Sequence, residues 1–291
     1  MLNRATTFAK HHTPNSVRVV ARRWVLDAHN ARVRLTTPVT SRCEFPNIYH
    51  CTVRKTASQW IKSLLSDPVV YRYSGLLLFD PRPYKWRPPN AVPTGRAVST
   101  LFVSRPAFDK IAKPERYRAF FIVRDPRDIV VSSYFSQRTS HTPMGDIPTV
   151  RPILQQRSKQ DGLLYMIENL AGKGVFKSLR SWQTAPASDS VRLFRYEDLT
   201  GERQAEEVDR LMRHCGITLP SGELEALLTR YSFSNMRRDR QTVGQLSHYR
   251  AGKAGDWQNH FDDEVYDAFT AAAGDLVEVL GYPPRDRTPL G

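Results

Sequence analysis

The sequence of 291 residues predicts an α/β fold in which helices cover both faces of a parallel sheet. Three short apolar segments have the length and composition of buried strands, and each is followed by a polar turn and a helical pattern. The hydrophobic fraction is 40% and the charged fraction is 25%, which is typical of a folded globular chain. Because no repeat or linker separates these units, we expect one domain over residues 45–291, preceded by a basic extension over residues 1–44.

The first unit begins with a strand predicted over residues 48–53, which lies between a proline and a polar stretch. A helix follows, with Ser58 as its candidate N-terminal cap. Its apolar residues recur every three or four positions until Asp67 and Pro68 end it. This unit is therefore a strand, a tight loop and a helix.

The second unit repeats this arrangement, with a strand predicted over residues 119–123 that ends at Arg124. Pro126 suits the first turn of the helix that follows. The proline-rich segments 80–95 and 137–152 are predicted to be loops. The other expected elements are helices over residues 160–170 and 174–183, a strand over 191–196, and helices over 204–215, 222–230 and 262–280. Ligands of such a sheet bind beyond the carboxyl ends of its strands.

The charge is unevenly distributed along the chain. Lysine and arginine number 43 against 29 acidic residues, a net charge of +14. Residues 1–120 hold 21 basic and 6 acidic residues, whereas residues 121–291 hold 22 and 23. We therefore expect the first part of the chain to meet an anionic partner: nucleic acid, an acidic membrane or a phosphorylated ligand. A solvated basic surface is the alternative.

Targeting and redox signals predict a cytoplasmic location. No apolar run approaches the roughly 20 residues that cross a bilayer, and the first residues lack the apolar stretch of a secretory signal. The three cysteines, Cys43, Cys51 and Cys215, are odd in number and lack Cys-x-x-Cys spacing. This pattern argues against a disulfide framework and a zinc site.

The segment CTVRKTASQW, residues 51–60, lies between the first strand and its helix. Unpaired N–H groups at a helix start favour an anion, and Lys55 adds a positive charge. The segment contains no glycine, so it is not the Gly-x-x-x-x-Gly-Lys-Ser/Thr loop of nucleotide triphosphate enzymes. A phosphate site is the functional interpretation, and a solvated loop lysine is the alternative.

The segment RDPRDIVVSSY, residues 124–134, follows the second strand. Arg124 offers a planar fork of donors for a phosphate, and Ser132 lies eight residues later on the helix. Asp125 and Asp128 suit capping and the helix dipole. An intrahelical ion-pair cluster is the alternative interpretation.

These segments resemble the motifs of sulfotransferases that use 3′-phosphoadenosine 5′-phosphosulfate (PAPS). Residues 51–60 resemble their 5′-phosphosulfate loop, and residues 124–134 resemble their 3′-phosphate motif. Three further segments are similar to the family in the same order: RYEDL at 195–199, YSFSNM at 231–236 and RAGKAGDWQNHF at 250–261. The five matches cover most of the chain.

The resemblance implies a P-loop-like three-layer fold and transfer of a sulfuryl group from PAPS to a hydroxyl or amine, with no metal expected. It implies that Lys55 is catalytic and stabilises the phosphate leaving group, where positive charge is needed. The cofactor residues that it implies are Arg54, Lys55, Thr56, Ala57, Ser58, Gln59, Trp60, Arg124, Ser132, Tyr196, Tyr231, Ser232, Phe233, Met236, Arg250, Ala251 and Gly252.

The sequence departs from the family pattern at three places. Ala57 stands where the family loop has a glycine, and Ala251 stands where a second basic residue is common. Residues 98–106 lack the catalytic histidine that many cytosolic members carry. A general base must titrate within reach of the acceptor. His141, in the loop after the second helix, is the candidate; His50, Asp80 and Asp109 are alternatives.

Two other functions are alternatives to sulfuryl transfer. A P-loop kinase or NTPase needs a glycine-lysine loop and a Mg²⁺ carboxylate, and the sequence offers neither. A non-catalytic binder of nucleic acid or anionic membrane would use the basic extension, but no nucleic-acid motif is present. Peripheral contact of the extension with an anionic membrane is compatible with the enzyme. The acceptor stays open among small molecules, lipids and carbohydrates, and the loops 80–95 and 137–152 are its candidate pocket walls. The aromatic residues that could form an apolar pocket are Tyr71, Tyr73, Phe79, Tyr84 and Trp86.

Overall fold

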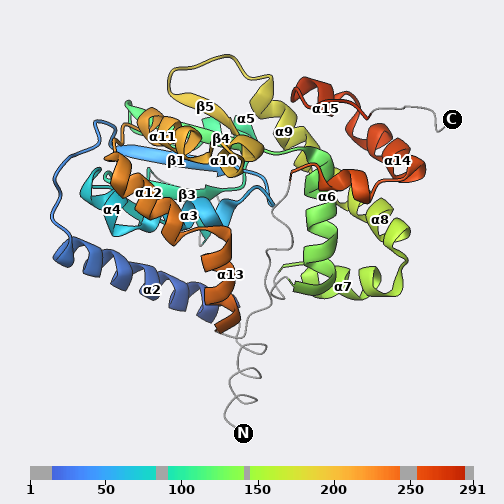
Figure 1. Cartoon of the computed structure of the whole chain (residues 1–291), viewed down its shortest axis with the longest axis horizontal. Coiled ribbons are helices and arrows are strands. Elements are labelled where there is room, and N and C mark those ends of the chain that lie inside the picture. The colour runs from blue at the N-terminus through green and yellow to red at the C-terminus, as the bar shows by residue number, and fades with distance from the viewer. Residues whose placement is uncertain (1–14, 83–90, 141–144, 243–253, 286–291) are drawn as a thin grey trace, which may run out of the picture.

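The computed structural model describes residues 15–82, 91–140, 145–242 and 254–285. Five parallel strands form one sheet in the order β2-β3-β1-β4-β5 (Figure 1). The predicted α/β class with a central parallel sheet is confirmed. The strands are β1 (Asn47–Thr52), β2 (Leu77–Phe79), β3 (Arg96–Leu101), β4 (Tyr117–Val123) and β5 (Val191–Arg195).

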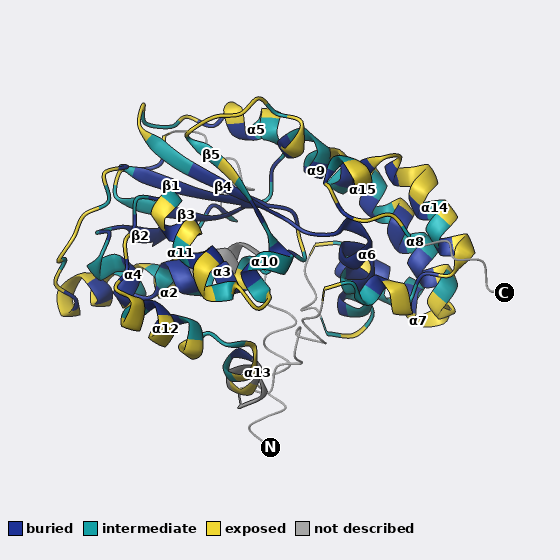
Figure 2. Ribbon diagram, turned by 45° about the horizontal axis from the view of Figure 1, so that its top comes forward, coloured by how far each residue is buried: buried dark blue, intermediate teal, exposed yellow. Residues whose placement is uncertain are grey.

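Alternate residues of each strand enter two separate cores, one on each face of the sheet, because successive side chains of a strand point to opposite faces. Ile48 and Phe120 belong to one core, and their chain neighbours Tyr49 and Phe121 belong to the other. Figure 2 shows the buried sheet between helices whose outer sides are exposed. The three-layer architecture follows from this alternation.

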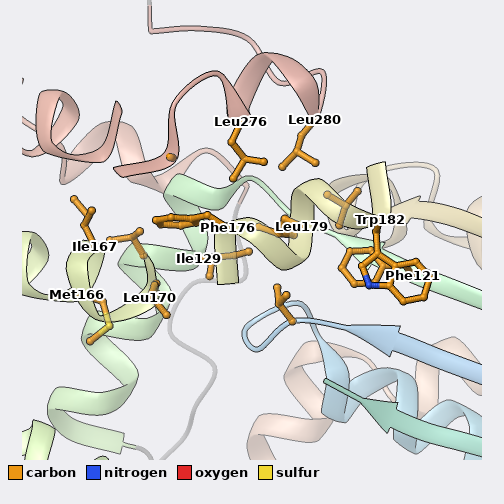
Figure 3. Close-up of a cluster of buried hydrophobic side chains, with 14 of the residues drawn as sticks. Phe121, Ile129, Met166, Ile167, Leu170, Phe176, Leu179, Trp182, Leu276 and Leu280 are labelled. Carbon is orange, nitrogen blue, oxygen red and sulfur yellow. The ribbon is translucent and has the colours of Figure 1, made fainter. Parts of the chain in front are cut away.

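The helices divide between the two cores. Those that contribute to the core of Ile48 are α3 (Ser58–Ser66), α4 (Pro68–Arg72), α10 (Tyr196–Thr200), α11 (Gln204–His214), α12 (Ser221–Arg230) and the start of α13 (Phe233–Thr242). Those that contribute to the core of Tyr49 are α5 (Arg105–Asp109), α6 (Pro126–Phe135), α7 (Ile147–Gln156), α8 (Lys159–Gly172), α9 (Val175–Gln183), α14 (Asp263–Ala273) and α15 (Leu276–Val279). In the second core, Trp182 stacks on Phe121 with ring centroids 4.7 Å apart (Figure 3).

Two strands were not predicted. β3 is buried in all but its first residue, yet Arg96, Ser99 and Thr100 interrupt any apolar run in its sequence. β2 has only three residues. β3 pairs with β1 on the side away from β4, and β2 pairs with the far side of β3.

The loop predicted over residues 137–152 is wrong. A π-helical turn η2 (Ser136–Ser140) continues α6, and α7 begins at Ile147. Ile147, Val150 and Leu154 recur at helical spacing and are buried, so packing outweighs the prolines. Pro148 lies in the first turn, where no intrahelical N–H bond is lost.

The last predicted helix, 262–280, is two helices in the structure. Gly274 separates α14 from α15 with a φ of 62°, a left-handed conformation that favours glycine. Before α14, a short 3-10 turn η3 (Asp256–Asn259) follows the segment that is not described.

The basic extension contains a helix that the sequence did not predict, α2 (Asn15–Thr36). The His29 Nε2 atom lies 2.9 Å from the Ser66 carbonyl oxygen, and Asn30 Nδ2 donates to the Leu78 carbonyl at 3.0 Å. Val33 is buried. The division into a basic extension and one domain stays a prediction. Among the described residues, no helix is long and apolar enough to cross a membrane.

Candidate active site

The loop between β1 and α3 is braced from inside by two threonines. Thr56 Oγ1 donates to the Val53 carbonyl at 2.8 Å and contacts Thr52 Oγ1, which donates to the Ile122 carbonyl on β4 at 2.8 Å. Both threonines are fully buried. The Thr56 hydroxyl therefore holds the loop against the sheet. The group of Thr56 that can contact a ligand is its backbone N–H.

The same loop keeps two residues in the left-handed region without a glycine. Lys55 has a φ of 73° and Ala57 a φ of 57°. Such conformations cost roughly 1–2 kcal/mol in residues that carry a Cβ atom. The threonine brace offsets this cost, which explains how the glycine-free loop keeps a tight turn.

The start of α3 carries no side-chain cap, so the predicted capping role of Ser58 is wrong. Ala57 occupies the cap position, and no side chain there accepts a hydrogen bond from the first turn. The first N–H groups of a nine-residue helix thus face the loop with the positive end of the helix dipole. This geometry suits a phosphate. Gln59 and Arg54 are exposed beside it.

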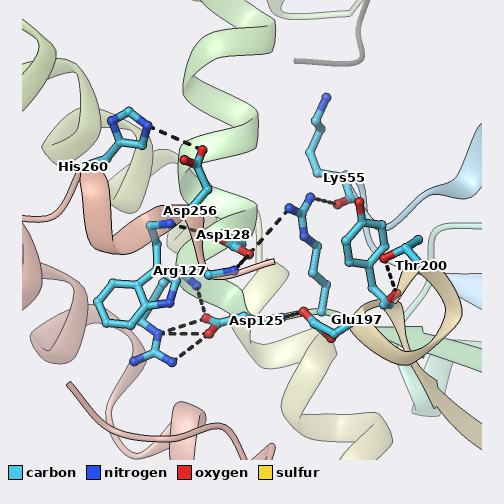
Figure 4. Close-up of polar contacts among 12 residues, drawn as sticks. Lys55, Asp125, Arg127, Asp128, Glu197, Thr200, Asp256 and His260 are labelled. Carbon is cyan, nitrogen blue, oxygen red and sulfur yellow. Dashed lines mark hydrogen bonds and ion pairs between the residues drawn. The ribbon is translucent and has the colours of Figure 1, made fainter. Parts of the chain in front are cut away.

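Arg124 joins the second motif to the first. Its Nη1 atom donates to the Lys55 carbonyl at 2.9 Å, and its guanidinium lies 4.3 Å from the ring centroid of Tyr196. Asp128 lies 3.6 Å away as an ion-pair partner. Arg124 Nε is buried and makes no hydrogen bond within the described chain. In Figure 4 the Lys55 side chain extends away from this network, so the lysine and the guanidinium present two separate cations.

Asp125 is an N-terminal cap, as the capping interpretation expected. Its carboxylate accepts from the Arg127 N–H at 2.9 Å and pairs with the Arg127 guanidinium at 2.7 Å. Glu197 accepts from the Asp125 N–H at 3.0 Å and from the Tyr282 hydroxyl at 2.8 Å, and burial raises the pKa of this glutamate. The buried Asp125 and the partly buried Glu197 thus link the ends of β4 and β5.

Asp128 ties the C-terminal motif to α6. Its two oxygens accept from the Gly255 and Trp257 N–H groups, each at 2.9 Å. The Trp257 ring lies 3.8 Å from the Arg127 guanidinium carbon. Burial raises the pKa of Asp128, while Arg124 and the two N–H donors act in the opposite direction. Gly255 and Trp257, in the described part of the C-terminal motif, therefore bind the ion-pair partner of Arg124.

The fourth motif contacts the first through Trp60. The indole Nε1 donates to the Tyr231 carbonyl at 3.1 Å, and the Tyr231 hydroxyl donates to Asp67 at 3.0 Å. Burial and the Asp67 charge raise the pKa of Tyr231 to about 12. Met236 is buried in the core of Ile48, whereas Phe233 is 38% exposed.

The candidate bases differ in their surroundings. His50 is fully buried, stacks on Phe120 and contacts Ser99 Oγ through Nδ1 at 2.9 Å, so it belongs to the core. Asp80 pairs with Lys62 and Arg82, which outweigh its burial and lower its pKa. Asp109 pairs with Arg105 at the surface.

Some of the predicted site residues lie outside the described residues, and some residues that shape the candidate site were not predicted. His141 and the residues Arg250, Ala251 and Gly252 lie outside the described residues. Ser132 is half-buried on α6, two turns beyond Arg124, and Ser232 contacts Ser234 near the start of α13. The bracing role of Thr52 was not predictable, because in sequence Thr52 is like any other strand residue. Asp67 was predicted only as a helix end, although Asp-Pro signals a cap and Asp67 caps α4.

Comparisons with known proteins point to one family. A family model described as the sulfotransferase domain matches residues 90–280. The chain is 24% identical over 188 residues to the 3-alpha-hydroxysteroid sulfotransferase of Cavia porcellus, and the match covers 61% of each chain. It is 23% identical over 205 residues to sulfotransferase 2A1 of Rattus norvegicus, with 65% of this chain and 66% of that one covered. The chain thus spans about 61% of the length of the first of these relatives.

Solved structures show the same fold. Mouse sulfotransferase SULT7A1 complexed with PAP has a TM-score of 0.58 at 17% identity, and the match covers 87% of this chain and 89% of that one. Retinol dehydratase in a complex with retinol and PAP has a TM-score of 0.51 at 16% identity, with 82% and 83% covered. At these identities the likeness concerns the arrangement of the sheet and helices.

Proposed function

Because the chain belongs to the sulfotransferase domain family, we propose that it transfers a sulfuryl group from PAPS to a hydroxyl or amine of an acceptor. PAPS supplies an activated sulfuryl group, and the other product is 3′-phosphoadenosine 5′-phosphate (PAP). The fit of the donor is supported by the uncapped start of α3 and by the buried Nε atom of Arg124. Both features offer hydrogen-bond donors to phosphate.

One observation carries the proposal: contacts link all five motif segments, and they centre on the Arg124 and Lys55 loops at the carboxyl edge of the sheet. Arg124 contacts Lys55 and Tyr196, Trp60 contacts the Tyr231 segment, and Asp128 binds the C-terminal motif. These segments are spread over more than two thirds of the chain. Convergence of basic groups and aromatic rings there supports a ligand with two phosphate groups and an aromatic base.

Lys55 and the start of α3 are proposed to hold the 5′-phosphate. Lys55 is the candidate catalytic cation, because negative charge grows on the oxygen between phosphorus and sulfur as the bond breaks. The N–H groups from Ala57 to Trp60 add donors. Arg54 and Gln59 lie exposed beside this loop.

Arg124 and Ser132 are proposed to hold the 3′-phosphate, together with residues 250–252. Asp128 supports this role, because it fixes Gly255 beside Arg124. The aromatic and apolar side chains proposed for the adenine side are Trp60, Tyr196, Tyr231, Phe233 and Met236, with Ser232 between them.

His141 is proposed as the general base. The flanking segments support it, because α6 and its extension η2 end at Ser140, one residue before His141. Burial acts to raise the pKa of Asp146, but Lys173 and, to a smaller extent, Arg54 lower it. The charge of Arg54, beside Lys55, therefore acts on a residue five positions after His141. A neutral imidazole would take the proton of the acceptor hydroxyl.

The acceptor is proposed to be a small apolar alcohol. Relatives are named for hydroxysteroids, and a structural neighbour contains retinol. In this chain, the half-buried Phe79 ends β2 at the carboxyl edge of the sheet, next to the 80–95 region predicted to form an acceptor wall. Tyr73 packs against the core on the opposite face of the sheet, so it does not share a pocket with Phe79. An aromatic side chain at this edge suits a steroid-like or lipid alcohol better than a bare sugar.

Binding of PAP tests the proposal without knowledge of the acceptor. Calorimetric titration of the full chain should give Mg²⁺-independent binding that ATP cannot match. Lys55→Ala and Arg124→Ala should each weaken it roughly 10- to 100-fold, since each removes a charged hydrogen-bond donor. Arg116→Ala, at the opposite end of β4, is the matched control and should change nothing. Urea unfolding of each variant separates lost contacts from lost folding.

Activity is then measured with labelled PAPS and a panel of steroid, retinoid and phenolic alcohols. His141→Ala should lower kcat roughly 10²- to 10⁴-fold and leave PAP affinity unchanged. Wild-type protein that is folded but does not bind PAP would refute the sulfotransferase proposal. Full activity of His141→Ala would refute only the choice of base.

A further inference from the structure

Helix α2 carries an apolar surface that nothing in the described chain covers. Of the four large hydrophobic side chains that are exposed in the described residues, three lie on this helix: Trp24 (72% exposed), Val25 (71%) and Leu35 (87%). Exposed apolar groups gathered on one element mark an interaction site more often than scattered ones do. These three side chains, Trp24, Val25 and Leu35, form the outer face of α2.

The outer face and the docked face of α2 lie on different sides of the helix. His29, Asn30 and Val33 face the domain, where the first two contact backbone carbonyl oxygens and the third is buried. Trp24 and Leu35 are eleven residues apart, which is three helical turns, so they share a side. Figure 1 shows α2 as a separate rod along one border of the molecule. One side of the helix is therefore bound to the domain while the other remains available.

The outer face is flanked by positive charge. The helix contains five arginines and a single acid, Asp27. Arg23, Arg32 and Arg34 are exposed, and the pairing of Arg23 with Asp27 is a long surface contact at 3.7 Å. Such a pair contributes little, so it does not neutralise the helix. Apolar residues with a tryptophan between arginines are typical of helices that lie in a membrane interface.

We propose that the outer face of α2 docks on an anionic membrane surface, with Trp24 and Leu35 entering the interface and the arginines contacting lipid headgroups. Charge decides between this partner and a second copy of the chain. Two copies paired through this face would bring their arginine flanks together, with one aspartate per helix to compensate. An anionic lipid surface complements the same charges. Membrane binding requires neither PAPS nor an acceptor alcohol, so it can be measured independently of sulfuryl transfer.

The test is flotation of the full chain with vesicles of phosphatidylcholine alone and of phosphatidylcholine with about 30% phosphatidylserine. Binding should require the anionic lipid and should fall steeply as salt is raised, because screening shortens the reach of the charges to about 3 Å at 1 M. The triple variant Arg23→Glu, Arg32→Glu and Arg34→Glu should lose at least roughly a hundredfold in partitioning. The matched control, Lys159→Glu, Lys177→Glu and Arg192→Glu, makes the same charge change at exposed positions elsewhere and should bind nearly as wild type.

Insertion is tested through Trp24. Brominated anionic lipids should quench part of the tryptophan fluorescence of the wild type, and Trp24→Phe should abolish that part. Equal loss of binding in the two charge-reversal variants would overturn the proposal, because net charge alone would then explain it. Failure to bind anionic vesicles would also overturn it. So would a dimer, seen by sedimentation velocity, that Leu35→Asp dissociates and that excludes lipid.

Discussion

Thr56 turns its hydroxyl inward, toward the sheet and away from the loop surface. The family resemblance places this residue beside the 5′-phosphate, and the structure narrows what it can do there. Its Oγ1 atom is used by Val53 and Thr52, both within the brace. Thr56 is therefore a positioning residue whose loss should disturb the loop before it disturbs any contact with phosphate.

Thr56→Val should lower the free energy of unfolding by about 1–3 kcal/mol, since a buried carbonyl and the Thr52 hydroxyl lose a partner. PAP affinity should fall at least roughly tenfold in parallel, because the loop loses its shape. Thr56→Ser keeps the hydroxyl and should retain most of both. Urea unfolding and calorimetric titration give the two quantities. A variant with lost affinity and unchanged stability would show instead that the hydroxyl touches the ligand.

At the scale of elements, α6 and α8 approach each other closely at one glycine. A Cβ atom at Gly162 would lie 2.5 Å from Cε2 of Tyr134 on α6, closer than packed atoms come. Tyr134 is buried against this face. Because α6 begins two residues after Arg124, the packing of α6 against α8 helps to fix the position of the Arg124 motif.

Gly162→Ala should therefore destabilise the protein by about 1–2 kcal/mol, although alanine favours a helix by about 1 kcal/mol over glycine. Gly172→Ala, at the end of the same helix, meets no atom within 4 Å and should be neutral or slightly stabilising. Thermal and urea unfolding measure both. If the two substitutions changed the free energy of unfolding equally, the Tyr134 ring would be able to move away from the new Cβ atom without loss of stability.

Some strands and helices could be predicted from the sequence, and others could not. β4 was predictable because residues 119–123 form a fully buried apolar run. β1 was predictable because its apolar residues lie between a proline and a polar stretch, which is typical of a strand. β3 was not, because Ser99 and Thr100 are buried with hydrogen bonds that only the tertiary structure reveals. The helix α7 was not predicted, because its prolines indicate a loop even though its apolar residues recur at helical spacing. In the site, charged residues were found by their motifs, while Thr52, Asp67 and the bonds of Asp128 depend on contacts between distant segments.

The whole molecule should be sensitive to acid because of His50. Burial lowers the pKa of this histidine to about 3, whereas the unfolded chain has the ordinary value of about 6.5. Below pH 6.5 the unfolded state therefore binds a proton that the folded state does not. Stability is then lost as the pH falls from about 6.5 toward 3, and His50 contributes no pH dependence above that range.

The expected loss from His50 is about 2 kcal/mol between pH 6.5 and pH 5. Urea unfolding of the wild type and of His50→Gln at about pH 7.5 and pH 5 measures it. The variant should be less stable at the higher pH, because the contact with Ser99 is changed, and should lose about 2 kcal/mol less on acidification. The same pH dependence in both proteins would mean that His50 is protonated in the folded state.

The network at the carboxyl edge of the sheet also has a consequence for synthesis of the chain. Lys55 and Arg124 leave the ribosome early, but Asp128 needs Gly255 and Arg127 needs the Pro283 carbonyl. Contacts between residues so far apart in sequence form late, after the loops that separate them have closed. A nascent chain shorter than about 255 residues lacks the segment that binds Asp128 beside Arg124, although it already contains the residues proposed to bind phosphate. Retention of the nucleotide would thus report that the C-terminal part of the chain has been made and has docked.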